Sequence, residues 1–368
     1  MNIFIAGGTG EHGRNCFCLD DGKNTYLLDC GIMASDKKNP YPALSNDQIR
    51  RLRLVFLTHS HADHTGAIGK IFSEGFNGII VASQETFLHL KEDCPNKVFL
   101  EDWKQVNLDK IFKIDVQYGK SGHCLGSVWL MLNFLEQGKK VLYTGDYCEH
   151  AKFYLCDKIR KTTADLAILD CAYGDEILSY KENCEIFVKA VKKYLAQGKK
   201  IALPLPKNGR CCEILRLLND ELPKEDRLFF ADEYFYTKFS RDELEKDKDW
   251  YKESAEKLFR KVKFYAGINC SPKGIIFISE PQLKSRRSSY AARRIVDSGG
   301  QVIFTGNIEK NSHAQYFFEK YTQQCKKIVF PIHQNQTDCE KLCAKNNFSK
   351  VITFHCESQD YKEKSFDF

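Results

Sequence analysis

The chain repeats one pattern, a short apolar run that ends at once in a polar or glycine-containing turn. The runs read TYLLDCG, LVFLTHSH, KVLYTGD, LAILDCAYG, KIALPLP, RLFFADE, GIIFISE, QVIFTGN, KIVFPIH and KVITFHC. Each is typical of a buried strand, and segments with helical periodicity, such as ENCEIFVKAVKKYLAQG, lie between them. The pattern predicts an α/β fold whose polar residues gather at strand ends, where such folds usually carry their sites.

Length and composition describe a globular protein. With 368 residues, 43% of them hydrophobic, the chain can form one elaborated domain or two ordinary ones. No apolar run approaches the ~20 residues of a membrane span, and the opening MNIFIAGGTGEHG lacks the pattern of a secretory signal. We therefore expect a soluble, cytoplasmic protein that binds no membrane. The charge-rich stretch 220–262 has the weakest strand signals and is our candidate for an exposed insertion or lid.

The cysteines and the net charge limit the classes of partner. No Cys-x-x-Cys pair occurs among the sixteen cysteines, so we expect small buried side chains in a reducing compartment and no cysteine zinc site. The formal charge of +6 and the isoelectric point of about 8.4 allow a polyanionic partner without requiring one.

The densest group of metal-binding side chains is HSHADH at 59–64, directly after a strand-like run. Alternation along the loop places His59 and His61 on the same side, where both can bind one ion. Asp63 and His64 face a neighbouring position and offer a carboxylate and an imidazole to a second ion. Packing alone gives no reason for so many imidazoles. The stretch predicts a metal site, although four ligands are too few for two ions.

Three further strand ends offer the missing ligands. His123 lies in SGHCLGS, where flanking glycines let the backbone come close, Asp146 lies in YTGDY, and His333 lies in FPIHQN. A single histidine in such a place is more often structural than a ligand, but the HSHADH stretch gives these residues weight. The seven residues together suffice for two ions that share one carboxylate.

These motifs resemble the metallo-β-lactamase superfamily. HSHADH, GHCLGS and TGD occur in its order, and GGTGEHGRNCFCLDDGKNTYLLDCG is similar to the opening strands of its nucleic-acid-processing members. LDCAYG, LPLPKNGRCCEIL and NSHAQYFFEKYTQQCKKIVFPIHQN follow in the order of the β-CASP group, which includes ribonuclease J and the endonuclease subunit of mRNA 3′-end cleavage. The resemblance implies an αββα sandwich domain at 1–175, an inserted α/β β-CASP-like cap at 176–308, and a return to the first domain at 309–368.

The resemblance also implies roles for individual residues. It assigns one zinc to His59, His61 and His123, a second zinc to Asp63, His64 and His333, the bridge to Asp146, and support of the site to Asp29. Because His61 is retained where iron-binding relatives tend to carry glutamate, two zinc ions are favoured, with manganese as the alternative. The candidate catalytic residues are Asp63, Asp170 and His313.

The implied chemistry is hydrolysis of a phosphodiester by a metal-activated hydroxide. His313, oriented by a hydrogen bond that its ring donates to Asp170, would protonate the leaving 3′-oxygen. The alternative is that His313 only caps the helix that follows it. His333 at the last family motif favours RNA, which we expect to be single-stranded, over DNA.

Basic side chains are the candidate substrate contacts. LKSRRSSYAARR places Ser285, Arg286, Arg287 and Ser288 after a strand end, where helix amides could join them around a phosphate, although a solvated basic helix face would look the same. Lys207 and Arg210 lie in the family-like KNGR loop. His12 and His150 lie near family site loops, whereas we expect His89 and His355 to be structural.

Three departures from the β-CASP pattern keep rival functions open. Few residues separate VIFTG from His313, NSHAQ lacks an acidic residue after its histidine, and IHQNQ lacks the usual Gly-Glu. The alternatives to a ribonuclease are a hydrolase of a small phosphoester, nucleotide or thioester, a DNA nuclease, or a nucleic-acid-binding protein with little turnover. A homo-oligomer is not indicated.

Overall fold

The described chain contains three sheets. In two of them, metal-binding side chains lie at the carboxyl ends of strands. The computed structural model describes residues 1–240, 248–252, 255–265 and 273–368, so the expected lid lies partly outside the described residues. The described chain forms two units. Unit 1 is Met1–Glu149, Cys156–Ile177 and His333–Phe368, and unit 2 is His150–Leu155 and Leu178–Ile332.

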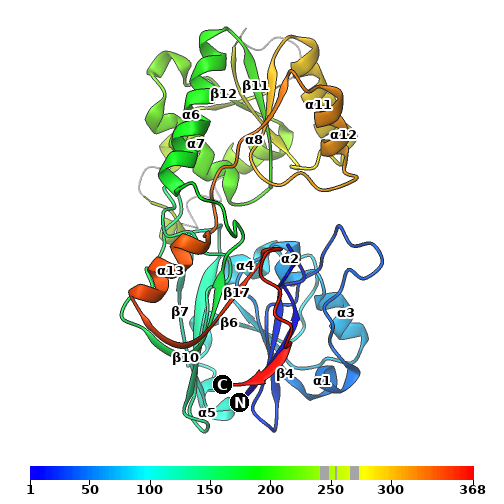
Figure 1. Ribbon diagram of the computed structural model, residues 1–368, viewed down its shortest axis with the longest axis vertical. Coiled ribbons are helices and arrows are strands. Elements are labelled where there is room, and N and C mark those ends of the chain that lie inside the picture. Colours follow the sequence, from blue (N-terminus) through cyan, green and yellow to red (C-terminus); the bar gives the residue numbers. More distant parts are fainter. Residues whose placement is uncertain (241–247, 253–254, 266–272) are drawn as a thin grey trace. The chain divides into compact units, whose positions relative to one another are not determined.

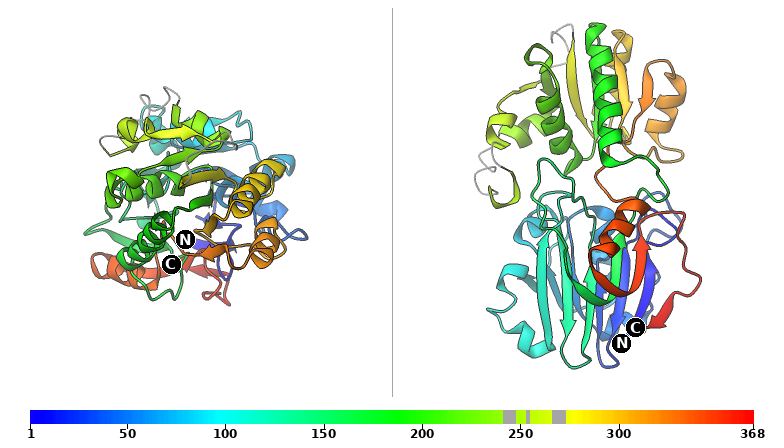
Figure 2. Two further views of the ribbon diagram at one scale, coloured as in Figure 1. Left: turned by 90° about the horizontal axis from the view of Figure 1, so that it is seen from above. Right: turned by 60° about the vertical axis from the view of Figure 1, so that its left-hand side comes forward.

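The first sheet of unit 1 has the order β18-β1-β2-β3-β4-β5-β6. Its strands are β1 (Asn2–Gly7), β2 (Cys16–Asp20), β3 (Thr25–Leu28), β4 (Leu52–Phe56), β5 (Ile79–Ala82), β6 (Lys97–Phe99) and β18 (Ser365–Asp367). The strands from β3 to β6 are parallel, and the others pair antiparallel. The pairing of β1 with β18 brings the two termini side by side (Figure 2).

The second sheet of unit 1 has the order β17-β10-β9-β8-β7. Its strands are β7 (Ile114–Lys120), β8 (Val128–Phe134), β9 (Lys139–Tyr143), β10 (Thr163–Asp170) and β17 (Asn347–Phe354). The strands β9, β10 and β17 are parallel, so their carboxyl ends meet at one edge of the sheet.

Aromatic side chains fill the space between these two sheets. The ring of Phe17 on β2 lies 5.5 Å from Tyr143 and 5.4 Å from Phe354, and Tyr26 lies 5.5 Å from Phe134. Each of these rings is almost fully buried, and a large ring buries 150–250 Å² of surface, so this layer holds the sheets together.

Short helices cover the outer faces of the sandwich. They are α1 (Asn46–Arg51), α2 (Ala62–Thr65), α3 (Ile68–Ser73), α4 (Gln84–His89), the 3₁₀ turn η1 (Leu100–Asp102), α5 (Leu108–Phe112) and α13 (Gln336–Ala344). Ile49 of α1 and Ile68 of α3 pack on the first sheet, and Leu342 of α13 packs on the second. Unit 1 is therefore an αββα sandwich, as the sequence predicts.

Unit 2 contains one parallel sheet of six strands in the order β13-β12-β14-β11-β15-β16. They are β11 (Lys200–Leu205), β12 (Phe229–Ala231), β13 (Val262–Phe264), β14 (Gly274–Ser279), β15 (Gln301–Phe304) and β16 (Cys325–Lys327). An all-parallel sheet needs helices on both faces. Figure 1 shows α6 and α7 to one side of the strands and α11 and α12 to the other.

The helices of unit 2 carry the amphipathic patterns that the sequence predicts. They are α6 (Tyr180–Ala196), α7 (Arg210–Glu221), η2 (Lys224–Asp226), α8 (Glu233–Ser240), η3 (Lys248–Trp250), α10 (Ala255–Phe259), α11 (Arg286–Asp297) and α12 (His313–Lys320). In α6, Val191 and Leu195 of the expected apolar face are buried together with Phe187, whereas Ile186, which we also expected on that face, is exposed. Among the described residues, no helix is both long enough and apolar enough to cross a bilayer.

The boundary between the inserted unit and the return segment differs from the one expected at 309. Residues 309–332 belong to unit 2 because β16 pairs in parallel with β15 and so extends its sheet. The chain returns to unit 1 only at His333.

Glu213 of α7 fixes the short segment 150–155 to unit 2. Its carboxylate is 1% exposed and accepts hydrogen bonds from the backbone N–H groups of Lys152 (2.6 Å), Phe153 (2.9 Å) and Tyr154 (2.9 Å). Burial raises the pKa of Glu213, and the three N–H donors oppose that shift. One carboxylate therefore satisfies three backbone donors of a segment that has no strand or helix of its own.

We expect Glu213→Ala to lower the free energy of unfolding by roughly 2–5 kcal/mol, because three N–H donors would lose their acceptor in a buried place. Urea denaturation followed by circular dichroism measures this change. Glu221→Ala on the same helix, where the side chain is exposed, is the matched control and should change stability by about 0.5 kcal/mol or less. Equal effects of the two substitutions would contradict the role of Glu213.

Candidate metal centre

Parallel strands place the first group of site residues at one edge of the first sheet. β3 and β4 pair with Leu28 opposite Phe56, so Asp29 and the loop from Leu57 to His61 leave the sheet at the same level. Asp29 has a positive φ of 58°, which turns its carboxylate toward that loop. Helix α2 then begins at Ala62 and carries Asp63 and His64 on its first turn.

The second sheet supplies the opposite group. Asp170 ends β10 in register with Phe354 of β17, so His355 follows at the level of Asp170. Asp146 follows the neighbouring β9, and His123 lies in the loop between β7 and β8. The edges of the two sheets thus bring together residues that are up to 326 positions apart, from Asp29 to His355.

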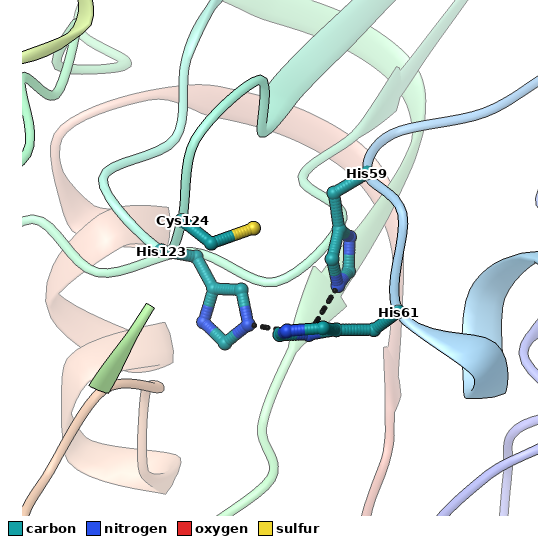
Figure 3. A group of neighbouring side chains, drawn as sticks. All are labelled: His59, His61, His123 and Cys124. Atoms are coloured by element: carbon teal, nitrogen blue, oxygen red, sulfur yellow. Dashed lines mark hydrogen bonds between the residues drawn. The ribbon is translucent and has the colours of Figure 1, made fainter. Parts of the chain in front are cut away.

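Three imidazoles converge on one point. Nδ1 of His61 lies 3.0 Å from Nε2 of His59 and 3.1 Å from Nε2 of His123 (Figure 3). Oδ2 of Asp146 lies 3.5 Å from Nε2 of His59 and 3.3 Å from Nε2 of His123. Three nitrogens and a carboxylate oxygen at such separations form a four-ligand set for one cation.

A second set faces the other oxygen of the same carboxylate. Oδ1 of Asp146 lies 3.0 Å from Nε2 of His64 and 3.2 Å from Nδ1 of His355. Oδ2 of Asp63 lies 3.2 Å from Nε2 of His355 and 3.8 Å from Nε2 of His64. Asp146 therefore has one oxygen toward each set, which is the arrangement that a bridging ligand requires.

Asp29 holds the second set in place from behind. Its carboxylate accepts hydrogen bonds from the backbone N–H and the hydroxyl of Thr58 (2.7 Å each) and from the hydroxyl of Tyr143 (2.6 Å), and it contacts Nδ1 of His64 at 2.6 Å. A contact of this kind fixes the ring so that the opposite nitrogen, Nε2, faces the metal position.

Buried charges and atoms without partners fit a site for cations. Among the described residues, His61 Nε2, Asp146 Oδ1 and His355 Nδ1 are buried and accept or donate no hydrogen bond. Burial lowers the pKa of His59 well below its usual value and lowers that of His61 to about 4. Both rings are therefore neutral and can donate an electron pair to a metal ion. At His355, burial is outweighed by the carboxylates of Asp146 and Asp63, which raise its pKa to about 10. Imidazoles around buried carboxylates are a ligand set for two divalent ions, and binding of the ions would release the protons of the second set.

His355 is the site residue that the sequence reasoning missed, because we expected it to be structural. It is 8% exposed and stands in the second set with Asp63 and His64, whereas His333, which we expected there, is grouped with Asp146, Asp170 and His355. Two signals could have found it. The run KVITFHC has the same strand-then-polar pattern as the other site segments, and Glu357 follows two positions later, which matches the acidic residue missing from IHQNQ.

His333 lies beside this set and pairs with Asp170. Nδ1 of His333 is 3.1 Å from Oδ2 of Asp170 and 3.7 Å from Oδ2 of Asp146. The carboxylate of Asp170 is fully buried and also accepts from the backbone N–H groups of Tyr147 (3.0 Å) and Ala172 (3.1 Å). The Asp–His pair that we expected between Asp170 and His313 is therefore formed by Asp170 and His333.

His313 is the first residue of α12 in unit 2. Its Nδ1 lies 3.2 Å from the carbonyl oxygen of Leu283, and the cap of the helix is Ser312, whose hydroxyl accepts from the N–H of Gln315. The helix cap suggested as the alternative for His313 is thus provided by the residue before it. A catalytic role for His313 stays a prediction.

The basic segment before and within α11 is held by an acidic residue. Glu280 accepts hydrogen bonds from the N–H of Ser285 (2.8 Å) and the hydroxyl of Ser288 (3.1 Å), so a carboxylate already occupies the place expected for a phosphate. Arg286 and Arg287 are exposed, and Arg287 pairs with Glu233 at 2.7 Å. These contacts favour the solvated basic face, and substrate binding by this segment stays a prediction.

Several other histidines and one cysteine lie near the described groups. The ring of His12 is 5.9 Å from that of His355, and His150 stacks on Tyr180 in unit 2. The sulfur of Cys124, which is adjacent to His123, points into the first ligand set in Figure 3. A cysteine next to the first set was not expected from the sequence, which has no pair of closely spaced zinc-binding cysteines.

An αββα sandwich with two ligand sets bridged by an aspartate defines a class of metallo-hydrolase, and comparison with known families agrees. A family model described as the metallo-beta-lactamase superfamily matches residues 9–189. The chain belongs to the metallo-β-lactamase superfamily. The buried histidine and aspartate groups are typical of the dinuclear metal site of that superfamily.

Similar proteins point to the β-CASP ribonucleases as distant homologues. Ribonuclease TTHA0252 of Thermus thermophilus is 27% identical over 59% of this chain and 54% of its own length. The probable RNase MJ4 of Methanocaldococcus jannaschii is 27% identical over 60% and 57%, and the cleavage and polyadenylation specificity factor subunit 3-II of Arabidopsis thaliana is 29% identical over 60% and 41%. The chain thus matches about half the length of these relatives.

A solved structure shares the fold over nearly the whole chain. It is the crystal structure of a protein of unknown function from Enterococcus faecalis V583, with a TM-score of 0.59 and 10% identity. The alignment covers 99% of this chain and 96% of that one, so the fold of both units, including the parallel third sheet, has a counterpart among known structures.

We expect His355→Ala to reduce the bound metal of the purified protein from about two equivalents to about one, because the second set would lose one of its four ligands. Inductively coupled plasma mass spectrometry measures the metal content. His89→Ala, an exposed histidine at the end of α4, is the matched control and should keep both equivalents. Loss of one equivalent in His333→Ala but not in His355→Ala would restore the ligand set expected from the sequence.

Proposed function

We propose that this chain is a metal-dependent phosphodiesterase that hydrolyses RNA. The observation that carries the proposal is the bridging position of Asp146 between two ligand sets with the Asp170–His333 pair beside it. The printed names of the relatives TTHA0252 and MJ4, which call those proteins a ribonuclease and a probable RNase, support the choice of RNA.

Each of the two ligand sets would bind one ion. His59, His61 and His123 would hold one ion, Asp63, His64 and His355 the other, and Asp146 both. Zinc suits this mixture of imidazoles and carboxylates, and manganese is the alternative. Bound ions of this kind activate a water molecule and offset the charge that builds on a phosphate during in-line displacement.

His333 is positioned to serve as the general acid. The carboxylate of Asp170 fixes the ring through Nδ1, which leaves Nε2 as the atom that can hold a proton for the departing 3′-oxygen. We therefore assign to His333 the role that the sequence suggested for His313.

We expect the purified protein to cleave single-stranded RNA in the presence of zinc or manganese and to lose this activity with a chelator, because the hydroxide is generated at the metal site. End-labelled RNA and matched DNA, resolved on a sequencing gel, measure cleavage and its polarity, and His59→Ala is the inactive control. A protein that binds two metals and cleaves neither polymer would indicate a small phosphoester or thioester substrate.

We expect His333→Gln to slow RNA cleavage by roughly 10²–10⁴-fold while metal content stays at the wild-type level, because the leaving oxygen would lack its proton donor. Single-turnover rates and metal analysis of the same preparation test this. His313→Gln is the matched comparison, and we expect it to retain most of the rate. The opposite ranking of the two variants would return the acid role to His313.

A further inference from the structure

Arg210 in unit 2 is a buried cation without a partner. It is 9% exposed, its Nε is buried and makes no hydrogen bond, and the described residues offer its side chain no ion pair. Burying a charge without a counter-charge costs several kcal/mol in a folded protein, so such residues are rare unless a ligand supplies the missing charge.

The backbone around Arg210 favours the same sign of ligand. Arg210 is the first residue of α7, which has twelve residues, and the N-cap position is Gly209, which has no side chain to satisfy the first N–H groups. The positive end of the helix dipole and these N–H groups attract anions. Gly209 has φ +81° and ψ −95°, a conformation that glycine adopts without the steric cost other residues incur.

The neighbouring strand adds a second buried donor without a partner. β15 pairs in parallel with β11, and Thr305 follows its carboxyl end just as the KNGR loop follows that of β11. The hydroxyl of Thr305 is buried, with 1% of the residue exposed, and makes no hydrogen bond within the described chain. A Cβ on the next residue, Gly306, would collide with Nη1 of Arg210, so the guanidinium lies directly against this turn.

Two lysines place further positive charge on the loop before α7. The ammonium of Lys238 donates to the carbonyl oxygen of Lys207 (2.8 Å) and to Oδ1 of Asn208, which fixes the loop. The ammonium of Lys207 lies 4.7 Å from the ring centre of Tyr234. Two carboxylates lie near this loop, and both have hydrogen-bond donors of their own. Glu213, in the first turn of α7, accepts from three backbone N–H groups, and Glu280 accepts from Ser285 and Ser288. Lys207 and Lys238 thus add positive charge to the loop that precedes Arg210, whose side chain forms no ion pair among the described residues.

We propose that Arg210, the hydroxyl of Thr305 and the N-terminus of α7 together bind one phosphate group. A tetrahedral phosphate has oxygens enough to accept from the guanidinium, the hydroxyl and the helix N–H groups at once. The inference rests on the proposed function only in taking RNA as the molecule that carries this phosphate. The two sources are a terminal 5′-phosphate and an internal phosphodiester, and they share this chemistry.

The proposal makes an unusual prediction for Arg210→Met. If the role of Arg210 is to bind a ligand, its unpaired buried charge destabilises the ligand-free protein. Replacing it by an apolar side chain of similar length removes that destabilisation, so the ligand-free variant melts at or above the wild-type temperature. If Arg210 only holds unit 2 together, the variant melts lower. Thr305→Val removes one hydroxyl that has no partner and keeps the shape of the side chain, so its ligand-free melting temperature should not fall.

The experiment measures thermal unfolding of the metal-loaded full chain with and without inorganic phosphate. Phosphate should raise the melting temperature of the wild type and of Arg216→Met, a control on the same helix whose arginine pairs with Asp220 at 2.9 Å. It should shift Arg210→Met and Thr305→Val much less. An equal shift in wild type and Thr305→Val, or in wild type and Arg210→Met, would overturn the proposal, as would a marked loss of ligand-free stability in Arg210→Met.

Binding of short RNA identifies the carrier. Fluorescence anisotropy with a phosphorothioate RNA pentamer should show a Kd weakened about tenfold or more by Arg210→Met. Affinity that needs a 5′-phosphate on the pentamer assigns the site to the RNA terminus, and affinity independent of it assigns the site to an internal phosphate. Unchanged affinity in both variants would contradict RNA as the carrier. Because cleavage is not measured, these outcomes are separate from failure of the proposed nuclease activity.

Discussion

The carboxylate of Asp146 is the constraint on which the site depends. It is 1% exposed, it lies at the end of a central strand of the second sheet, and histidines from both sheets surround it. A buried carboxylate is tolerated only when neighbouring groups stabilise its charge. Here burial raises its pKa, but the surrounding imidazoles outweigh that effect and hold the pKa well below its usual value. The negative charge of Asp146 attracts these rings and also determines where cations can bind.

The sequence predicted the parts of the site that depend on local pattern. HSHADH and Asp146 could be found because each lies just after an apolar run, and His123 because of its glycine-containing loop, and the structure brings them together in two sets around one carboxylate. The fold class could be predicted for the same reason, since the runs and the helical periods between them are properties of short segments. The αββα sandwich itself was implied by the resemblance to the metallo-β-lactamase superfamily.

The exchange of His333 and His355 shows where local pattern fails. Both histidines follow strand-like runs, and which of them reaches the second set depends on strand pairing. Because β17 pairs in parallel with β10, Phe354 stands opposite Asp170, and the next residue enters the site. The sheet order β17-β10-β9 is a non-local property that single-sequence patterns do not contain. The late return at His333 has the same origin, since β16 extends the third sheet by pairing with β15.

Each of the two units retains buried charged groups that reduce stability unless a ligand is bound. The charges of these groups have opposite signs in the two units. Unit 1 buries the carboxylates of Asp29, Asp146 and Asp170, whose negative charge divalent cations would neutralise. Unit 2 buries the guanidinium of Arg210 and the carboxylate of Glu213 on one helix, but only the carboxylate has hydrogen-bond partners among the described residues. Natural proteins retain such destabilising groups where function requires them. The carboxylates of unit 1 and the guanidinium of Arg210 in unit 2 therefore call for ligands of opposite charge.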